Sequence, residues 1–153
     1  MNYEQESARL TEAAAGVAPE ALPGYLGQIR ASLLPEERAF AVYMRHKLRE
    51  KGILQQNVFL AADISENYGY KLLAQEKHTR NRSVILRLCF AARLTPEEVQ
   101  EALTLYGMAP LHGRLARDVV LLSAFAGGIR DIHEADALLR ANGMRPISDS
   151  EEG

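Results

Sequence analysis

Residues 54–73, LQQNVFLAADISENYGYKLL, decide the fold of this 153-residue chain. Apolar residues recur at helical spacing on both sides of Asp63, and Ser65 is a residue type favoured just before the first turn of a helix. The stretch predicts a helix over 54–62, a sharp turn at Asp63 and a second helix over 65–74 rich in polar groups and tyrosines. This is the outline of a helix-turn-helix.

Helical spacing continues through the rest of the chain, and strand signals are nearly absent. A helix over 35–51 is expected to bury Phe40, Tyr43, Met44 and Leu48 and to end at Gly52. Thr95-Pro96-Glu97-Glu98 combines a capping threonine, a proline at the first helical position and two acids, which predicts a helix ending at Gly107. Further helices are expected over 83–93, 114–126 and 131–142. The predicted class is all-α.

The positions of helix-breaking residues and of the expected helices divide the chain into four parts. Residues 1–34 contain prolines and glycines that interrupt helices, so one or two short helices with a mobile start are expected there. Residues 35–107 hold the helix-turn-helix, and residues 108–147 are a helix pair expected to pack on it. Residues 148–153, SDSEEG, are expected to form a frayed acidic tail.

A weak internal repeat links two helix pairs. The stretch from Arg82, RSVILRLCFAARLTPEEVQEALTLYGMAPL, resembles the stretch from Arg117, RDVVLLSAFAGGIRDIHEADALLRANGMRPI. One inserted residue raises the offset from 35 to 36. Each unit would leave an apolar face open by itself, so the two are expected to stack, with Val119, Leu122, Leu138 and Leu139 packing inward. The alternative is coincidence among Leu/Ala-rich helices.

Composition favours a cytoplasmic protein. The single cysteine, Cys89, cannot form an internal disulfide, and no apolar run approaches the roughly 20 residues needed to cross a bilayer. The first residues lack the basic and then apolar pattern of a secretion signal. The formal net charge is −2, so any nucleic-acid binding must come from local clustering of cations.

Signals for catalysis and for metal or cofactor binding are absent from the sequence. The four histidines (His46, His78, His112 and His133) show no metal-ligand spacing with cysteines or carboxylates. No GxxxxGK[ST] loop occurs, and no nucleophile is paired with a base. We therefore expect a protein without enzymatic activity, cofactor or metal.

Polar and basic side chains cluster around the second predicted helix. Ser65, Glu66, Asn67 and Tyr70 place polar groups at its start, where a helix in the major groove of DNA contacts base edges. The amide of Gln55, at the start of the preceding helix, is suited to a phosphate or a base. From Lys71 to Arg93 six cations stand against one acid, a basic patch of the kind that phosphate binding needs. Within it, Lys71, Lys77, Arg80 and Arg82 are the candidate DNA contacts.

At these residues the chain resembles the lambda-repressor/Cro-type helix-turn-helix family, also called the Xre family. The matching elements are Gln55 and Val58, then Ala62-Asp63-Ile64-Ser65, then Tyr68, Lys71 and Leu72, followed by the basic connector and LRLCFAARLTPEE. The likeness covers about residues 36–107, and the extension TLYGMAPLHGRLARD is similar to that of a subgroup with two extra helices. The resemblance implies a five-helix DNA-binding core, a bacterial transcriptional regulator and a homodimer that holds duplex DNA through Gln55 and the 65–71 helix.

Several residues depart from the family pattern. The family usually has alanine at the position of Phe59 and a branched aliphatic residue at that of Gly69, and a glycine within a helix costs about 1 kcal/mol relative to alanine. Glu66 would repel phosphates unless it accepts a hydrogen bond from cytosine. These departures motivate a second interpretation, in which the chain kept the helical fold, lost operator binding and became an interaction module for a regulatory protein partner.

Overall fold

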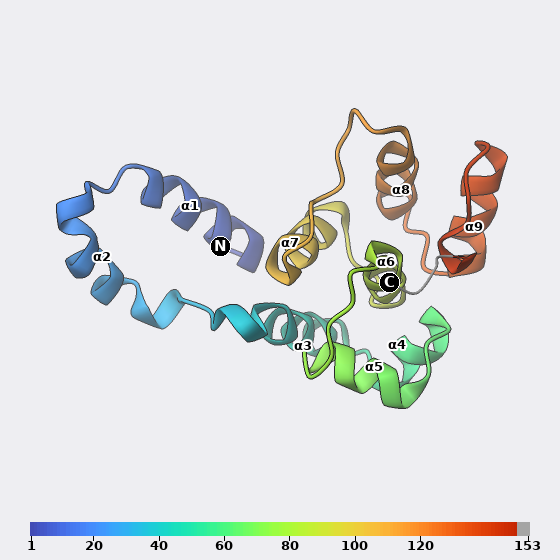
Figure 1. Cartoon of the computed structure of the whole chain (residues 1–153), viewed down its shortest axis with the longest axis horizontal. Helices are drawn as coiled ribbons and strands as arrows, with labels where there is room; N and C mark the ends of the chain where they lie inside the picture. The colour runs from blue at the N-terminus through green and yellow to red at the C-terminus, as the bar shows by residue number, and fades with distance from the viewer. Residues whose placement is uncertain (150–153) are drawn as a thin grey trace. The chain divides into compact units, whose positions relative to one another are not determined.

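The computed structural model describes residues 1–149, and all regular structure within them is helical (Figure 1). This confirms the predicted all-α class. Seven of the helices are those expected from residue 35 onward, and six of them begin and end within two residues of their predicted bounds. The α-helices are α1 (Tyr3–Ala15), α2 (Leu22–Gln28), α3 (Ala39–Lys51), α4 (Gln55–Ala62), α5 (Glu66–Leu73), α6 (Arg82–Ala91), α7 (Pro96–Tyr106), α8 (Ala116–Ala126) and α9 (Ile132–Ala141).

The helix predicted from residue 35 begins later than expected. Residues Glu36–Arg38 form a short 3-10 turn, and Arg38 leaves the helical region with φ −131° before α3 starts at Ala39. The far end agrees with the prediction, because Gly52 adopts the left-handed conformation (φ 68°) that ends a helix. The capping box at Thr95 and Glu98 and the left-handed Gly107 (φ 88°) bound α7 as expected.

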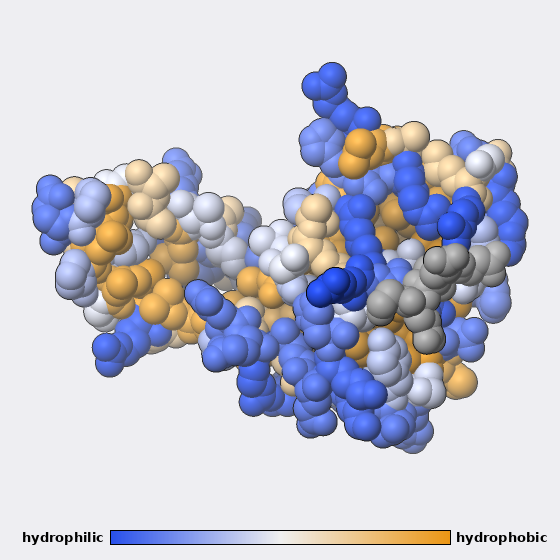
Figure 2. All heavy atoms as spheres, in the orientation of Figure 1, coloured by the Kyte–Doolittle hydropathy of each residue, from blue (hydrophilic) through white to orange (hydrophobic). Residues whose placement is uncertain are grey.

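The chain divides into two compact units, residues 1–35 and the residues from 36 onward. The first unit holds α1, whose start is fixed by a capping box between Asn2 and Gln5, and α2. None of its side chains is fully buried, and Leu22, Leu26 and Leu33 are exposed. Figure 2 shows apolar surface gathered over this unit.

The second unit has its core between two pairs of helices. α3 packs against α7, and α4 packs against α6. The four apolar side chains expected on the inner face of α3 are buried, and Phe40 meets the ring of Tyr106 edge-on at 4.9 Å. These contacts bury the largest aromatic side chains of the unit and fix the frame on which α5 is held.

The internal repeat is present in the structure. α6 and α7 correspond to α8 and α9, and the equivalent rings of Phe90 and Phe125 stack at 3.8 Å. In each copy one side chain of the second helix holds the backbone eleven residues later. The Gln100 side chain bonds Leu111 through both its donor and its acceptor (2.7 Å each), and the Asp136 carboxylate accepts from the Ile147 amide at 2.7 Å. The shared contacts favour a true repeat over coincidence.

The C-terminal pair packs on the rest of the unit, but not through every expected side chain. Leu139 is buried and Leu122 and Leu138 are half-buried, whereas Val119 is exposed, so its predicted inward position is wrong. The start of the segment expected to be a frayed tail is ordered. Residues Ile147–Asp149 form a 3-10 turn in which the Ser148 hydroxyl donates to Asp136; the rest of the tail lies outside the described residues.

Among the helices of residues 1–149, none has the length and apolar character needed to cross a membrane.

Candidate functional site

The turn between α4 and α5 sets the direction of the polar helix. Asp63 ends α4 in the left-handed conformation (φ 56°, ψ 49°), and the next amide, that of Ile64, donates back to Phe59 at 3.0 Å. The Ser65 hydroxyl then caps α5 by accepting from the Tyr68 amide at 3.4 Å. The chain therefore changes direction within three residues, and both helices are held by local hydrogen bonds.

The inner face of α5 anchors this helix to the core. Leu72 is fully buried, and Ile64 and Tyr68 are half-buried. Gly69 is also buried, and its backbone lies against the ring of Phe59. The aromatic ring from α4 thus supplies the inward bulk that α5 lacks at Gly69.

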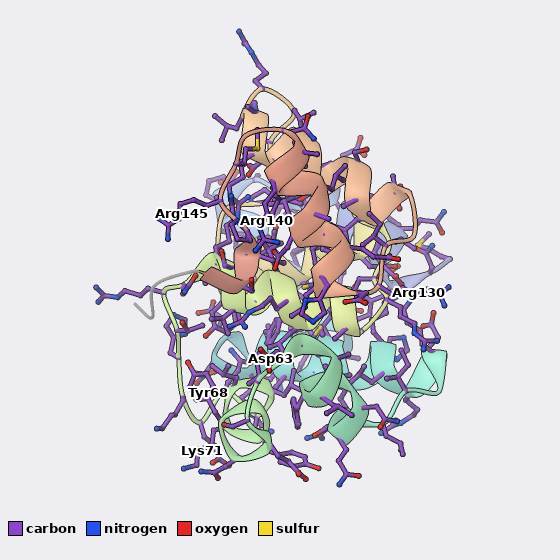
Figure 3. The ribbon with its side chains drawn as sticks, turned by 90° about the vertical axis from the view of Figure 1, so that its right-hand side faces the viewer. Asp63, Tyr68, Lys71, Arg130, Arg140 and Arg145 are labelled. Carbon is purple, nitrogen blue, oxygen red and sulfur yellow. The ribbon has the colours of Figure 1, made fainter. Side chains whose placement is uncertain are left out.

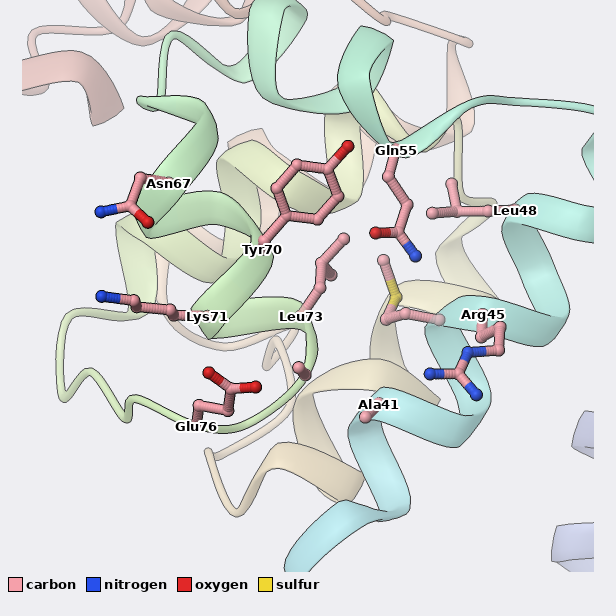
Figure 4. Close-up of a pocket in the computed structure, with 11 residues that line it drawn as sticks. Ala41, Arg45, Leu48, Gln55, Asn67, Tyr70, Lys71, Leu73 and Glu76 are labelled. Carbon is pink, nitrogen blue, oxygen red and sulfur yellow. The ribbon is translucent and has the colours of Figure 1, made fainter.

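The outer face of α5 opens onto a hollow of about 350 Å³ between α3, the start of α4 and α5 (Figure 4). Asn67, Tyr70 and Lys71 come from α5, and Gln55 comes from the first turn of α4. Figure 4 shows Tyr70 and Gln55 turned toward each other, with Asn67 and Lys71 on the outer edge. The floor is apolar, formed by Met44, Leu48 and Leu73. Four of the nine predicted site residues are therefore brought together here.

Two further predicted residues, Ser65 and Glu66, lie exposed at the start of α5. Ser65 serves as the cap described above. A carboxylate oxygen of Glu66 accepts a long hydrogen bond from the Gln56 amide nitrogen at 3.5 Å. Glu66 is thus directed toward α4, and its negative charge stays on the outer face of the helix pair.

Arg45 is a residue of this hollow that the sequence did not reveal. It lies on α3 and is exposed, so its charge faces solvent beside Gln55 (Figure 4). Its position between the buried Met44 and the polar His46 marks it only as a surface residue. Arg45 and the polar face of α5 line the same hollow because α3 and α5 pack side by side.

The connector between α5 and α6 is held in place by contacts with distant residues. The Gln75 side chain accepts from the Ala41 amide at 2.9 Å, and the Thr79 amide donates to the Tyr106 hydroxyl at 2.8 Å. The His78 ring stacks on the Tyr106 ring at 4.6 Å. Burial raises the pKa of Tyr106, and the bond from Thr79 partly opposes this. Lys77 and Arg80 are exposed on this braced connector.

Arg82, the last of the predicted contacts, is engaged within the protein. Its two terminal nitrogens each lie 3.1 Å from a carboxylate oxygen of Asp118, a buried residue of α8. Asp118 also accepts from the His112 amide at 2.8 Å. The geometry places Arg82 in a bridge between the two repeats and away from the group of Gln55, Asn67, Tyr70 and Lys71.

Metal-ligating side chains and the cysteine form no site within the described part of the chain. No cluster of three or more metal-ligating side chains occurs there. Cys89 is buried, and burial raises the pKa of its thiol far above the usual range, which suits a core residue. Comparison of the chain with protein-family models, curated proteins and solved structures finds no match.

Proposed function

We propose that this chain binds duplex DNA as a transcriptional regulator, with α4 and α5 as a helix-turn-helix and α3 to α7 as a lambda-repressor-like core. The observation that carries the proposal is the shared outward face of Gln55, Asn67, Tyr70 and Lys71, with Arg45 beside them. A face of this kind combines groups that read bases with groups that hold phosphates.

The dimensions and the chemistry of α5 suit the major groove. The groove is about 12 Å wide, which admits one helix with its side chains. The amide of Asn67 can donate one hydrogen bond to adenine and accept another from it. Gln55, in the first turn of α4, carries the same amide group. Lys71 carries a charge suited to guanine or phosphate, and the Tyr70 hydroxyl is suited to the backbone of the DNA.

Flanking cations would fix the orientation of the helix pair on the duplex. Arg45 lies on one side of the hollow, and Lys77 and Arg80 extend from the connector after α5. Phosphate contacts of this kind give affinity without sequence preference. Arg82 is left out of this set, because its guanidinium is bonded to Asp118.

One helix pair covers only half of an operator, so the regulator is proposed to act as a homodimer. Two copies about 34 Å apart would place two α5 helices in successive turns of the groove. The surfaces available for pairing lie outside residues 54–73. The exposed leucines of the first unit (Leu22, Leu26 and Leu33) form one of them.

A second function, docking of a regulatory protein partner on the same face, is favoured by exposed apolar side chains. Leu54, which precedes α4, and Leu60, within α4, are 66% and 82% exposed. Glu66 and Glu76 add two exposed carboxylates nearby. Such a surface would suit a basic, apolar segment of a protein better than a phosphate backbone.

Selection of bound sequences from a random duplex library, followed by titration of the best duplex at several salt concentrations, separates the two functions. DNA binding predicts an enriched, two-fold symmetric motif and an affinity that falls steeply with salt. Asn67→Ala should change the enriched motif, whereas Arg130→Ala, on the loop between α8 and α9, should leave it unchanged. A library without enrichment, together with no salt-dependent binding, would overturn the DNA proposal in favour of the protein partner.

A further inference from the structure

A second hollow lies on the other side of α5, between the α4–α5 turn, the connector and α6. Its volume is about 480 Å³. Figure 3 shows Asp63 and Tyr68 at the edge of the helix pair that faces the connector. The residues that line it are Asp63, Ile64, Ser65, Tyr68, Lys77, Thr79, Val84 and Arg87. None of the four residues that share the first hollow lines this one, so the two are separate.

Two cations in this second hollow have no acidic partner among residues 1–149. The Nε atom of Arg87 is buried and makes no hydrogen bond in the described part of the chain. Lys77 is exposed, and neither cation belongs to an ion pair with another described residue. A buried N–H of a charged group without an acceptor is costly and calls for an explanation. Arg87 as a whole is half-buried and lines the hollow, so an anion bound there would lie against its guanidinium.

The remaining walls indicate which kind of anion fits. Ile64, Val84 and the ring of Tyr68 offer apolar and aromatic surface, and Ser65 and Thr79 offer hydroxyl groups. The lining holds two cations, Lys77 and Arg87, against one carboxylate, that of Asp63, so the site carries a net positive charge. A ligand with an acidic group at one end and an apolar body at the other would contact both the cations and the apolar surface of the hollow.

We propose that this hollow, named here the Arg87 hollow, binds a small organic carboxylate. The carboxylate accepts from Arg87 and Lys77, and the apolar body packs between Ile64, Val84 and Tyr68. Arginine suits this task, because its planar guanidinium presents parallel N–H groups to the two oxygens of a carboxylate.

The position of the site gives the ligand a route to the helix pair. Its walls come from the turn before α5, from α5 itself and from the connector that carries Lys77. A bound carboxylate would hold these segments together, and it would neutralise a cation otherwise available to a phosphate. If the proposed function holds, the ligand is an effector that lowers DNA affinity; the site itself does not depend on that function.

Nuclear magnetic resonance titrations of the full chain without DNA test the site directly. The probes are benzoate, the uncharged benzamide of the same shape, and inorganic phosphate. Benzoate should give saturable shifts of the Ile64, Ser65, Val84 and Arg87 amides, and benzamide should bind at least about tenfold more weakly because it lacks the charge. Arg87→Gln and Lys77→Gln should each weaken benzoate binding, whereas Arg80→Gln, a cation of the same connector outside the hollow, should not.

The outcomes are distinguishable. Equal binding of benzoate and benzamide, or unchanged benzoate binding by Arg87→Gln in a variant with a native spectrum, would overturn the proposal. Phosphate binding as tightly as benzoate would overturn the organic class of ligand. Since no DNA is present, failure of the DNA proposal would leave this result standing, and failure here would leave the DNA proposal untouched.

Discussion

The ring of Phe59 fills the space in front of Gly69: a Cβ atom placed on Gly69 would lie 2.3 Å from Cδ1 of that ring. Both residues are buried, one on α4 and the other on α5. Phe59 and Gly69 are therefore complementary, since a large side chain at position 59 leaves no room for one at position 69. Tyr70 completes the contact by meeting the Phe59 ring edge-on at 4.8 Å.

The first prediction concerns this pair. Gly69→Ala should lower the free energy of unfolding by about 1–3 kcal/mol, because the added methyl group overpacks against the ring. In a Phe59→Ala background the same change should instead stabilise by about 1 kcal/mol, since only the helix preference of alanine remains. Urea unfolding of the wild-type protein, the two single variants and the double variant measures the coupling free energy between positions 59 and 69.

Gly24→Ala is the matched control, because Gly24 lies within α2 and a Cβ atom placed on it would have no neighbouring atom within 4 Å among the described residues. It should not destabilise the protein. The same sign for Gly69→Ala in both backgrounds would show that the ring and the glycine are not coupled.

The second prediction concerns Glu98, which lies between two lysines of α3. Its carboxylate oxygens lie 2.9 Å from Lys47 Nζ and 2.8 Å from Lys51 Nζ. Burial raises the pKa of Glu98, but the hydrogen bonds from Lys51, the Thr95 amide and Lys47 outweigh it and lower the pKa from 4.5 to about 2. The folded pKa is below the unfolded one, so this carboxylate stabilises the fold above pH 4.5, and the contribution is lost as the pH falls toward 2.

Glu98→Gln should therefore remove about 3 kcal/mol of stability near neutral pH and flatten the dependence of unfolding free energy on pH between those two values. Chemical denaturation across the pH range measures both effects. Glu97→Gln, at the neighbouring position, should leave the curve unchanged. An equally steep acid loss in Glu98→Gln would assign the pH dependence to other carboxylates.

The third prediction separates Arg82 from its neighbour Arg80. Arg82→Gln should lower stability by about 2 kcal/mol, since it leaves the buried Asp118 without its charged partner. Arg80→Gln, on the exposed connector, should cost almost nothing. Thermal unfolding of the two variants measures this difference in stability. Equal melting temperatures would show that the Arg82–Asp118 bridge contributes little to stability in solution.

The fourth prediction concerns the cations proposed to hold phosphates. Lys77→Ala and Arg80→Ala should each weaken binding to all duplexes alike and reduce the salt slope of the affinity by about 1. Fluorescence anisotropy against the selected duplex and a scrambled one measures this. Arg130→Ala serves as the control, since Figure 3 shows Arg130 far from Lys71. A loss confined to the selected duplex would instead assign Lys77 and Arg80 to base recognition.

The fifth prediction concerns assembly. The full chain should be a dimer by light scattering, because the exposed leucines of the first unit need a partner surface. Leu26→Glu should weaken the dimer without unfolding the second unit, and Leu60→Glu, within the helix pair, should not change the assembly. A monomer at every concentration, with and without DNA, would contradict the proposed dimer and favour the protein-partner function.

Sequence alone determined most of the helix ends from residue 35 onward, the start of α3 excepted, because these depend on contacts between residues a few positions apart. The capping box at Thr95, the left-handed glycines Gly52 and Gly107 and the turn at Asp63 are local features, and each is found where the sequence predicts it. The internal repeat is equally visible in sequence, since the same local signals recur at an offset of 35 to 36 residues.

Tertiary structure alone decided which surface residues act together. Asp118 lies 36 residues after Arg82, and the packing of α3 beside α5 places Arg45 and Asn67 around the same hollow. The Arg87 hollow exists only because the connector returns across the α4–α5 turn. A one-dimensional pattern reports that a side chain is polar and on the outside of its own helix. It does not report which neighbour covers that side chain, because that is set by how helices distant in sequence pack.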